Sequence, residues 1–163
     1  MLMPTVRIAA RRLTRGPEDA KDALQVALLE VLRSAGNFRG DGPLRGWASR
    51  IAMRAVARFS TRQYAAQPDA LDAAPEQGRW ASTVVIDALP RPLSIYLDAL
   101  PEAQRTALVL RHSLECTIPE IAEITESPVP TVKSRLLKGL QRVREAIRRD
   151  VRFGVASPKE AGG

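Results

Sequence analysis

The chain has 163 residues, and its 25 basic and 18 acidic side chains give a formal net charge of +7, which favours a polyanionic partner. Aromatic residues make up only 4% of the chain, a composition that favours helices and argues against a β-sandwich. A single cysteine, Cys116, excludes an internal disulfide and a cysteine metal cluster, and no apolar run is long enough to span a bilayer, so we expect a cytoplasmic protein without a membrane partner.

Two helices are predicted at the start of the chain. The first carries an apolar stripe at helical spacing, which consists of Val6, Ala9, Ala10 and Leu13. Gly16 and Pro17 separate it from a second amphipathic helix over residues 18–33, whose first turn holds Glu18 and Asp19, where the helix dipole favours negative charge. The positions of this second helix that are expected to face inward are Ala20, Leu24, Ala27, Leu28, Val31, Leu32 and Ala35.

A glycine-rich loop over residues 34–42 leads to a third helix, with Pro43 in its first turn. The expected apolar face of this helix comprises Leu44, Trp47, Ala48, Ile51, Ala52, Ala55 and Phe59. A basic stripe runs along the same helix, where an arginine recurs every four residues with no carboxylate between Asp41 and Asp69. The stripe consists of Arg50, Arg54, Arg58 and Arg62. Like charges at this spacing repel one another, so bound phosphates would stabilise the stripe, and a solvated helix face is the alternative.

Helical periodicity fades over residues 63–90, where Ala, Pro, Asp, Gln and Gly dominate, and we predict a flexible linker there. The distribution of charge agrees with this division. Residues 1–62 hold 12 basic and 5 acidic side chains, a net charge of +7, residues 63–99 hold 2 and 5, a net of −3, and residues 100–163 hold 11 and 8, a net of +3. Two basic blocks around an acidic one suggest two binding modules and a spacer.

Helices resume at residue 93, and the C-terminal part is predicted to form a helix-turn-helix. A short helix from residue 93 and a longer one from residue 101 precede a capping-box pattern, which consists of Thr117 and Glu120. A turn at residues 126–127 then leads into a long last helix, which is expected to begin with Ser127 as its N-cap and to run to about residue 152. Residues 153–163 are expected to be a disordered tail.

The last helix has a polar, cationic face away from its apolar stripe. This face consists of Thr131, Lys133, Ser134, Arg135, Lys138, Gln141 and Arg142. Hydroxyls, amides and long cations are the groups that reach base edges and phosphates, so the pattern favours DNA binding. The alternative is a solvated face of a small helical bundle.

The C-terminal motifs resemble one family. Residues 100–105 (LPEAQR), 120–124 (EIAEI) and 128–136 (PVPTVKSRL) look like the C-terminal domain of extracytoplasmic-function (ECF) sigma factors, which are bacterial transcription initiation factors. The resemblance implies that the last helix reads the major groove of the upstream, minus-thirty-five promoter element through the seven polar residues named above.

The N-terminal part carries an independent resemblance to the same family. Residues 18–25 (EDAKDALQ) are similar to the acidic start of its polymerase-binding helix, and residues 38–47 (FRGDGPLRGW) with 50–52 (RIA) look like its promoter-melting segment. Asp19, Asp22 and Gln25 share one helix face, and the resemblance implies that this face meets core RNA polymerase together with Leu28 or Leu29. It also implies that the loop captures a base flipped from the minus-ten element. The residues expected to contact that element are Asn37, Phe38, Arg39, Gly40, Asp41, Arg50, Arg54 and Arg58.

The sequence departs from the family pattern in three places. Family members usually carry Asn and Asp in the third helix where this chain has Arg54 and Arg58, which bears on how the minus-ten element is recognised. In the turn of the helix-turn-helix, residues 125–127 (TES) replace the commoner Leu-Gly-Ile. The chain also begins late relative to the family, so part of the first helix, and any helix before it, is expected to be missing or supplied otherwise.

These observations predict an all-α protein with two small helical domains joined by a flexible linker, the C-terminal one a helix-turn-helix. The predicted division is a region 2-like domain over residues 1–62, the linker over 63–90, a region 4-like domain over 91–152 and the tail over 153–163. The predicted function is that of a sigma factor, which binds core RNA polymerase and promoter DNA, and an anti-sigma factor is a further candidate partner.

Two other classes of function stay open at this stage, a stand-alone helix-turn-helix regulator and a sigma-like protein-interaction module. Catalysis is not expected, and neither is a cofactor or a metal. His112 and Cys116 could form a nucleophile pair, but the sequence offers no partner to orient them. Both residues are therefore expected to pack within their domain.

Overall fold

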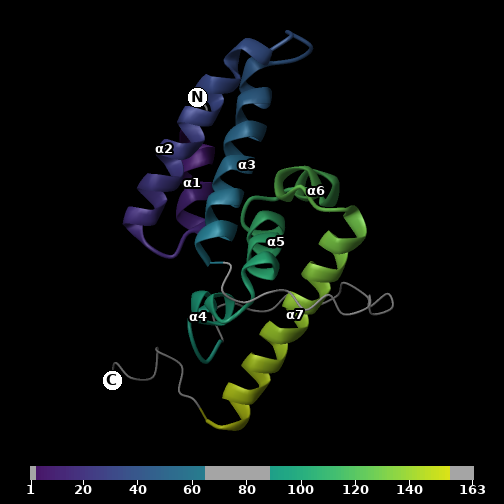
Figure 1. Ribbon diagram of the computed structural model, residues 1–163. Helices are drawn as coiled ribbons and strands as arrows, with labels where there is room; N and C mark the ends of the chain where they lie inside the picture. The colour runs from purple at the N-terminus through teal and green to yellow at the C-terminus, as the bar shows by residue number, and fades with distance from the viewer. Residues whose placement is uncertain (1–2, 65–88, 155–163) are drawn as a thin grey trace.

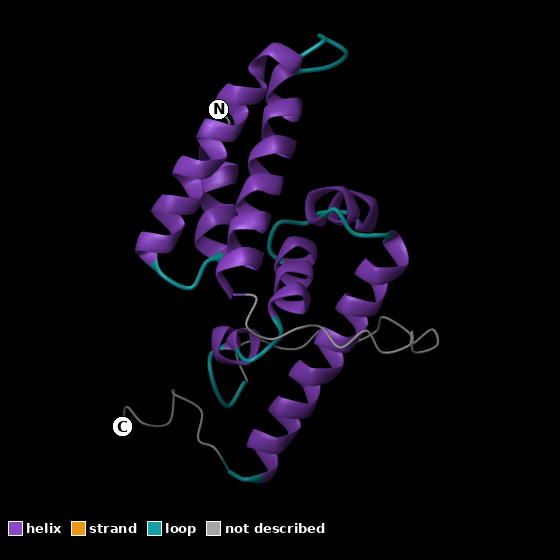
Figure 2. Ribbon diagram, in the orientation of Figure 1, coloured by secondary structure: helices purple, strands orange, loops and turns teal. Residues whose placement is uncertain are grey.

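The computed structural model describes residues 3–64 and 89–154, and these two ranges contain helices and no strand (Figure 1, Figure 2). In chain order the helices are α1 (Met3–Leu13), α2 (Pro17–Ser34), the 3-10 helix η1 (Ala35–Asn37), α3 (Leu44–Tyr64), α4 (Leu93–Asp98), α5 (Glu102–His112), α6 (Ile118–Thr125) and α7 (Val129–Arg152). The all-α prediction is confirmed. Most of the predicted linker and tail lies outside the described residues. None of the helices in the described ranges combines the length and the apolar character that a bilayer crossing requires.

Helices α1, α2 and α3 pack together as a three-helix bundle (Figure 1). Small side chains line its interior, so the helix backbones can approach closely. The buried residues include Val6, Ala9, Ala10, Leu13, Ala20, Ala23, Ala27, Ala52, Ala55 and Val56. All four residues of the stripe predicted for the first helix are therefore buried.

Two leucines that were expected to face inward are exposed instead. Leu32 of α2 exposes 70% of its surface, and Leu44 of α3 exposes 58%. Helix α1 has 11 residues, whereas α2 has 18 and α3 has 21, so α2 and α3 extend past α1 at the end where a loop joins them. At that end α1 no longer covers the apolar side chains of α2 and α3. Helical periodicity alone therefore predicted the burial of these two leucines wrongly.

Helices α5, α6 and α7 form the helix-turn-helix part of the chain, and the short α4 packs against α7 (Figure 1). The core of this C-terminal half is built from larger aliphatic side chains than the core of the N-terminal bundle. The buried residues include Leu100, Leu108, Leu110, Ile121, Ile124, Val132, Leu136 and Val143. The turn before α7 passes through Glu126, whose φ of 53° lies in the left-handed region and ends α6.

The start of α7 corrects one detail of the prediction. Pro128, and not Ser127, occupies the N-cap position, and no side chain caps the helix there. The Ser127 hydroxyl instead donates a hydrogen bond to the Thr125 carbonyl at 3.1 Å, within the turn. Two prolines close together restrict the backbone before the first turn of the helix, so the helix begins one residue later than the N-cap preference of serine suggests.

The predicted capping box at the start of α6 is present. The Thr117 N–H donates to Glu120 Oε2 at 2.7 Å, and the Glu120 N–H donates to Thr117 Oγ1 at 3.4 Å. The hydrogen bonds from the Thr117 backbone and side chain lower the pKa of Glu120 below its ordinary value of 4.5. A lowered carboxylate pKa adds stability above pH 4.5, and this contribution is lost as the pH falls through the folded-state pKa.

We expect the variant Glu120→Gln to weaken the pH dependence of unfolding on the acidic side of pH 4.5, because glutamine keeps the cap geometry and removes only the titrating group. Urea unfolding at neutral pH and near pH 3.5 measures the effect. Glu145→Gln on the exposed surface of α7 is the control with the same chemical change. An unchanged acid dependence in Glu120→Gln would contradict the role of this carboxylate.

The two halves of the chain dock on each other, and a buried polar cluster lies at their contact. Glu102 of α5 has 2% of its surface exposed, and its Oε1 lies 2.5 Å from the Ser60 hydroxyl of α3. Arg105 of α5 donates from Nη1 to the Leu13 carbonyl at 2.8 Å and from Nη2 to the Arg12 carbonyl at 3.2 Å, both at the end of α1. The buried apolar residues of both halves also form one continuous cluster. The sequence did not predict this docking.

Candidate functional site

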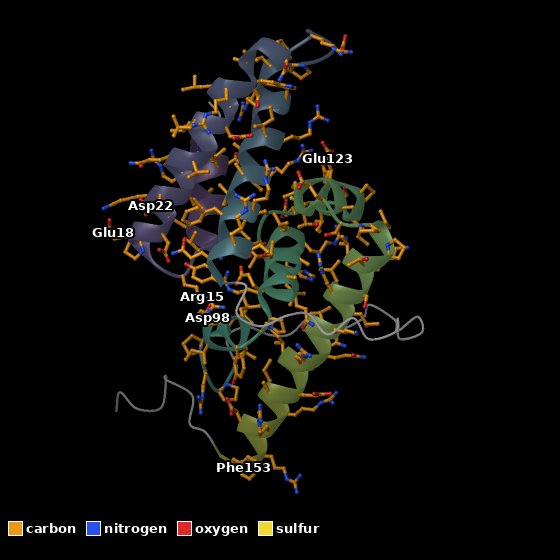
Figure 3. All side chains as sticks on the ribbon, viewed as in Figure 1. Arg15, Glu18, Asp22, Asp98, Glu123 and Phe153 are labelled. Atoms are coloured by element: carbon orange, nitrogen blue, oxygen red, sulfur yellow. The ribbon has the colours of Figure 1, made fainter. Side chains whose placement is uncertain are left out.

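The first predicted interface lies on the outer side of α2. Asp22, Gln25 and Leu29 are exposed, with 51% of the Leu29 surface accessible, while Leu28 is half-buried. Figure 3 shows Asp22 and Glu18 pointing away from the other helices. An acidic group beside an exposed leucine on one helix face suits a protein partner that offers a cation next to an apolar surface.

Asp19, the first residue of this predicted face, is engaged within the chain. Its carboxylate accepts hydrogen bonds from the Gln63 side-chain amide at 2.8 Å and from the Tyr64 hydroxyl. The Arg15 backbone N–H donates to the same hydroxyl oxygen at 3.1 Å. Burial and the hydrogen bond to Asp19 raise the pKa of Tyr64, so its hydroxyl remains a donor at neutral pH. Asp19 therefore fixes the end of α3 to the start of α2, a role that its spacing in the sequence did not indicate.

The predicted base-capturing loop connects η1 to α3 at one end of the bundle (Figure 1). Phe38 packs on Trp47, with ring centroids 5.3 Å apart and ring planes inclined by 57°, and both side chains are half-buried. Gly40 has a φ of 80°, a left-handed conformation that glycine adopts without strain. The aromatic pair thus anchors a loop whose tip faces solvent. The exposed residues of this predicted site are Asn37, Arg39, Gly40, Asp41 and Arg50.

The arginine stripe of α3 is partly neutralised by carboxylates of the same chain. Arg54 Nη2 lies 3.3 Å from Glu123 Oε1, and Arg54 Nε lies 3.7 Å from Glu126 Oε1. Arg58 Nη1 lies 3.6 Å from Glu126 Oε1, and its Nη2 lies 3.9 Å from Glu30 Oε1. The sequence indicated that an anion would stabilise this stripe, and in the structure glutamates from α2, α6 and the turn after α6 pair with Arg54 and Arg58.

The third predicted interface lies along the first four turns of α7. Lys133, Gln141 and Arg142 are exposed, and the other members are half-buried, namely Thr131, Ser134, Arg135 and Lys138. Arg135 Nη1 donates to the Ser127 hydroxyl oxygen at 2.8 Å, and Arg142 Nη1 donates to Gln104 Oε1 at 3.2 Å. Arg135 is therefore held against the turn and Arg142 against α5, while Lys133 and Gln141 are exposed to solvent.

The only cysteine has the chemistry of a structural thiol. Burial, and then the charge of Glu120, raise the pKa of Cys116, so its side chain stays protonated at neutral pH. Partial burial and the neighbouring Arg111 lower the pKa of His112. His112 is exposed, which corrects the expectation that it packs within the domain, because it lies in the last turn of α5. Within the described ranges, no group of His, Cys, Asp and Glu side chains is placed to hold a metal ion.

Comparisons with known proteins match both ends of the chain. Residues 1–65 match the family described as Sigma-70 region 2, and residues 96–143 match the family described as Sigma-70, region 4. The ECF RNA polymerase sigma-E factor of Escherichia coli K12 is 30% identical over 141 residues, which cover 79% of this chain and 72% of the relative. This chain belongs to the family of ECF RNA polymerase sigma factors. Its predicted function as an RNA polymerase sigma factor is confirmed at that level, and the two alternative classes are not favoured.

Further relatives agree with the assignment of this sigma factor. The RNA polymerase sigma-H factor of Pseudomonas aeruginosa is 28% identical over 148 residues, covering 83% of this chain and 77% of the relative. Among solved structures, the sigma factor RpoE in complex with the anti-sigma factor NepR from Bartonella quintana aligns with a TM-score of 0.57 at 21% identity, over 91% of this chain and 93% of that chain. The structural match supports the fold.

Proposed function

We propose that this sigma factor binds core RNA polymerase through the outer face of α2 and contacts promoter DNA through two separate surfaces. The polymerase face consists of Asp22, Gln25, Leu28 and Leu29, and Asp19 supports it by fixing the start of α2. The observation that carries the proposal is the pair of family matches, because each match covers the helices on which an independently predicted binding face lies.

The minus-ten element would be opened at the loop between η1 and α3. The exposed loop tip and the basic stripe lie next to each other in sequence, so one can hold a base while the other holds phosphates. Removing a base from the stack costs about a few kcal/mol, which contacts in the loop have to offset. The Phe38–Trp47 pair keeps the ends of the loop in place, so less ordering is needed when DNA binds.

The minus-thirty-five element would be read by α7 as the recognition helix of the helix-turn-helix. Lys133 and Gln141 are exposed on this helix and offer a cation and an amide, the groups that reach phosphates and base edges in the major groove. The partly buried Arg135 is held by Ser127 in the turn, which fixes the side chain in one position before DNA arrives.

Lys133 provides a direct test of the α7 assignment. We expect Lys133→Ala to weaken binding of the reconstituted holoenzyme to a promoter about tenfold, the effect of losing one charge-assisted contact. The dependence of log K on log salt should fall by about 0.9 if that contact is to a phosphate. Arg148→Ala removes the same charge from an exposed position on the same helix and lies beyond the region 4 match, so it is the control. Equal losses in the two variants would contradict the assignment.

The proposed role requires no catalytic group from this chain, because the polymerase carries out RNA synthesis, and it places the protein in the cytoplasm. An anti-sigma factor is a further proposed partner. The solved relative from Bartonella quintana is in complex with the anti-sigma factor NepR, and its fold aligns with most of this chain.

A further inference from the structure

The helix-turn-helix half covers part of the basic stripe on α3. Glu123 of α6 accepts a hydrogen bond from Arg54 at 3.3 Å, and Glu126, in the turn after α6, lies within 3.7 Å of both Arg54 and Arg58. Figure 3 shows Glu123 on α6, the helix that packs against α3. Two of the four arginines that the sequence offers for phosphates are therefore paired with carboxylates from the other half of the chain.

The pairing involves a residue with an uncommon backbone conformation. Glu126 lies in the turn between α6 and α7. Glu126 adopts a φ of 53°, a conformation that is uncommon for a residue other than glycine. This turn residue of one half thus contacts both arginines of the other half.

The ion pairs between the two halves are partly exposed. The side chains of Arg54, Arg58, Glu123 and Glu126 expose between 31% and 50% of their surface, so water and salt screen the ion pairs. Arg54 Nε is buried without a hydrogen bond in the described part of the chain, so the closed contact does not satisfy this arginine fully. Phosphate oxygens could replace the carboxylates on the same guanidinium groups.

Besides these ion pairs, the buried polar cluster of Ser60, Glu102 and Arg105 also joins the two halves. When the halves separate, Glu102 loses the hydrogen bond from Ser60, and Arg105 loses its hydrogen bonds to the Leu13 and Arg12 carbonyls, so these groups bind water instead. The polar cluster lies near one end of α3, and the pairs with Arg54 lie one to two turns away on the same helix. The two contacts together hold α5 and α6 along α3.

We propose that this sigma factor has a closed, self-inhibited state in which Glu123 and Glu126 occupy Arg54 and Arg58, and that separation of the two halves releases these arginines for promoter phosphates. The inhibitory part of the proposal rests on the proposed role of α3 in binding DNA. The existence of the closed state does not rest on it, because the state is defined by contacts within the free chain.

Spin-label distance measurements on the full chain, without DNA or polymerase, test the closed state. The labels are placed at Lys21→Cys on α2 and Arg148→Cys on α7, in a Cys116→Ser background, since the two labelled positions are exposed. We expect Glu123→Gln with Glu126→Gln to raise the population at longer distances about five- to tenfold, because several partly exposed ion pairs are removed together. The control, Glu115→Gln with Glu145→Gln, changes two exposed glutamates of the same half and is expected to leave the distances unchanged.

A charge exchange provides the second variant. Arg54→Glu with Arg58→Glu should open the protein, and adding Glu123→Arg with Glu126→Arg should close it again, because all of the ion pairs between the two halves are then restored with reversed charges. The closed state would be overturned if the double variant Glu123→Gln with Glu126→Gln showed the same spin-label distances as the wild-type protein. It would also be overturned if the charge exchange did not restore the short distances.

Binding of the free chain to a single-stranded DNA probe tests the inhibitory step. We expect the Glu123→Gln with Glu126→Gln variant to bind several-fold more tightly than the Glu115→Gln with Glu145→Gln control, which has the same net charge. If the double variant opens but does not bind the DNA probe more tightly, the inhibitory role is overturned and the closed state is still supported. The holoenzyme measurement with Lys133→Ala is independent of both results, so failure of the proposed function would be recognised separately.

Discussion

Asp22→Arg is expected to lower the affinity of the sigma factor for core RNA polymerase by about a hundredfold or more, because a like charge placed at a complementary interface costs several kcal/mol and about 1.4 kcal/mol corresponds to tenfold in affinity. Asp22 is exposed on the outer face of α2 and points away from the other helices (Figure 3). The substitution should therefore leave the bundle folded. A binding titration with purified core polymerase measures the loss.

Asp22 is a better test of this face than Asp19. Asp19 accepts hydrogen bonds from Gln63 and Tyr64, so its replacement would loosen the bundle and weaken polymerase binding indirectly. Glu145→Arg, which makes the same charge change on the exposed surface of α7, is the control and should bind polymerase normally. Normal binding by Asp22→Arg would show that the polymerase contacts another surface.

Gly139→Val is expected to destabilise the C-terminal half by about 1–3 kcal/mol, the usual cost of overpacking a close contact, because the small gain in helix propensity over glycine offsets only part of that cost. A Cβ added at Gly139 would stand 2.9 Å from Leu108 Cδ1 and 3.4 Å from Gln104 Cβ. Glycine at this position lets α7 approach α5 closely. Urea unfolding followed by circular dichroism measures the change.

Two further variants separate crowding from the general effect of replacing glycine in a helix. Gly139→Ala should be much milder than valine, since the Leu108 methyl can move and alanine favours the helix by about 1 kcal/mol. Gly46→Val in α3 is the control, because the nearest atom to its Cβ is Pro43 Cγ at 3.8 Å. A Gly139→Val protein as stable as the Gly46→Val protein would rule out the close contact between α5 and α7.

The helices and their internal features could be predicted because they depend on residues near one another in sequence. The apolar stripe of α1 and the capping box of Thr117 and Glu120 are of this kind, and both are present. Predictions became unreliable where an element ends. Leu32 and Leu44 lie where α1 no longer packs against α2 and α3, and Pro128 rather than Ser127 is the N-cap of α7.

The docking of the two halves could not be predicted, because the residues that make it look like ordinary surface residues. Ser60, Glu102 and Arg105 are polar and far apart in sequence, and their partners become apparent only when α1, α3 and α5 are placed in space. The arginine stripe gave a partial signal, since its repulsion indicated a bound anion. The sequence could not show that Glu123 and Glu126 would supply the negative charge.

The docked arrangement suggests an order of events. Asp22 and Leu29 are exposed while Arg54 and Arg58 are paired, so the proposed polymerase face is available before the proposed DNA-binding stripe is. If polymerase binds α2 first, separation of the two halves can follow on its surface, and promoter phosphates can then replace the two glutamates. Free sigma factor would accordingly bind promoter DNA more weakly than holoenzyme does.

Run-off transcription with purified core RNA polymerase on pooled genomic promoter fragments, with and without the chain, tests the central claim most directly. We expect discrete transcripts that appear only when the chain is present and that are lost with Asp22→Arg. The absence of new transcripts, with DNA binding by the chain alone retained, would contradict the sigma factor function and would favour a stand-alone regulator.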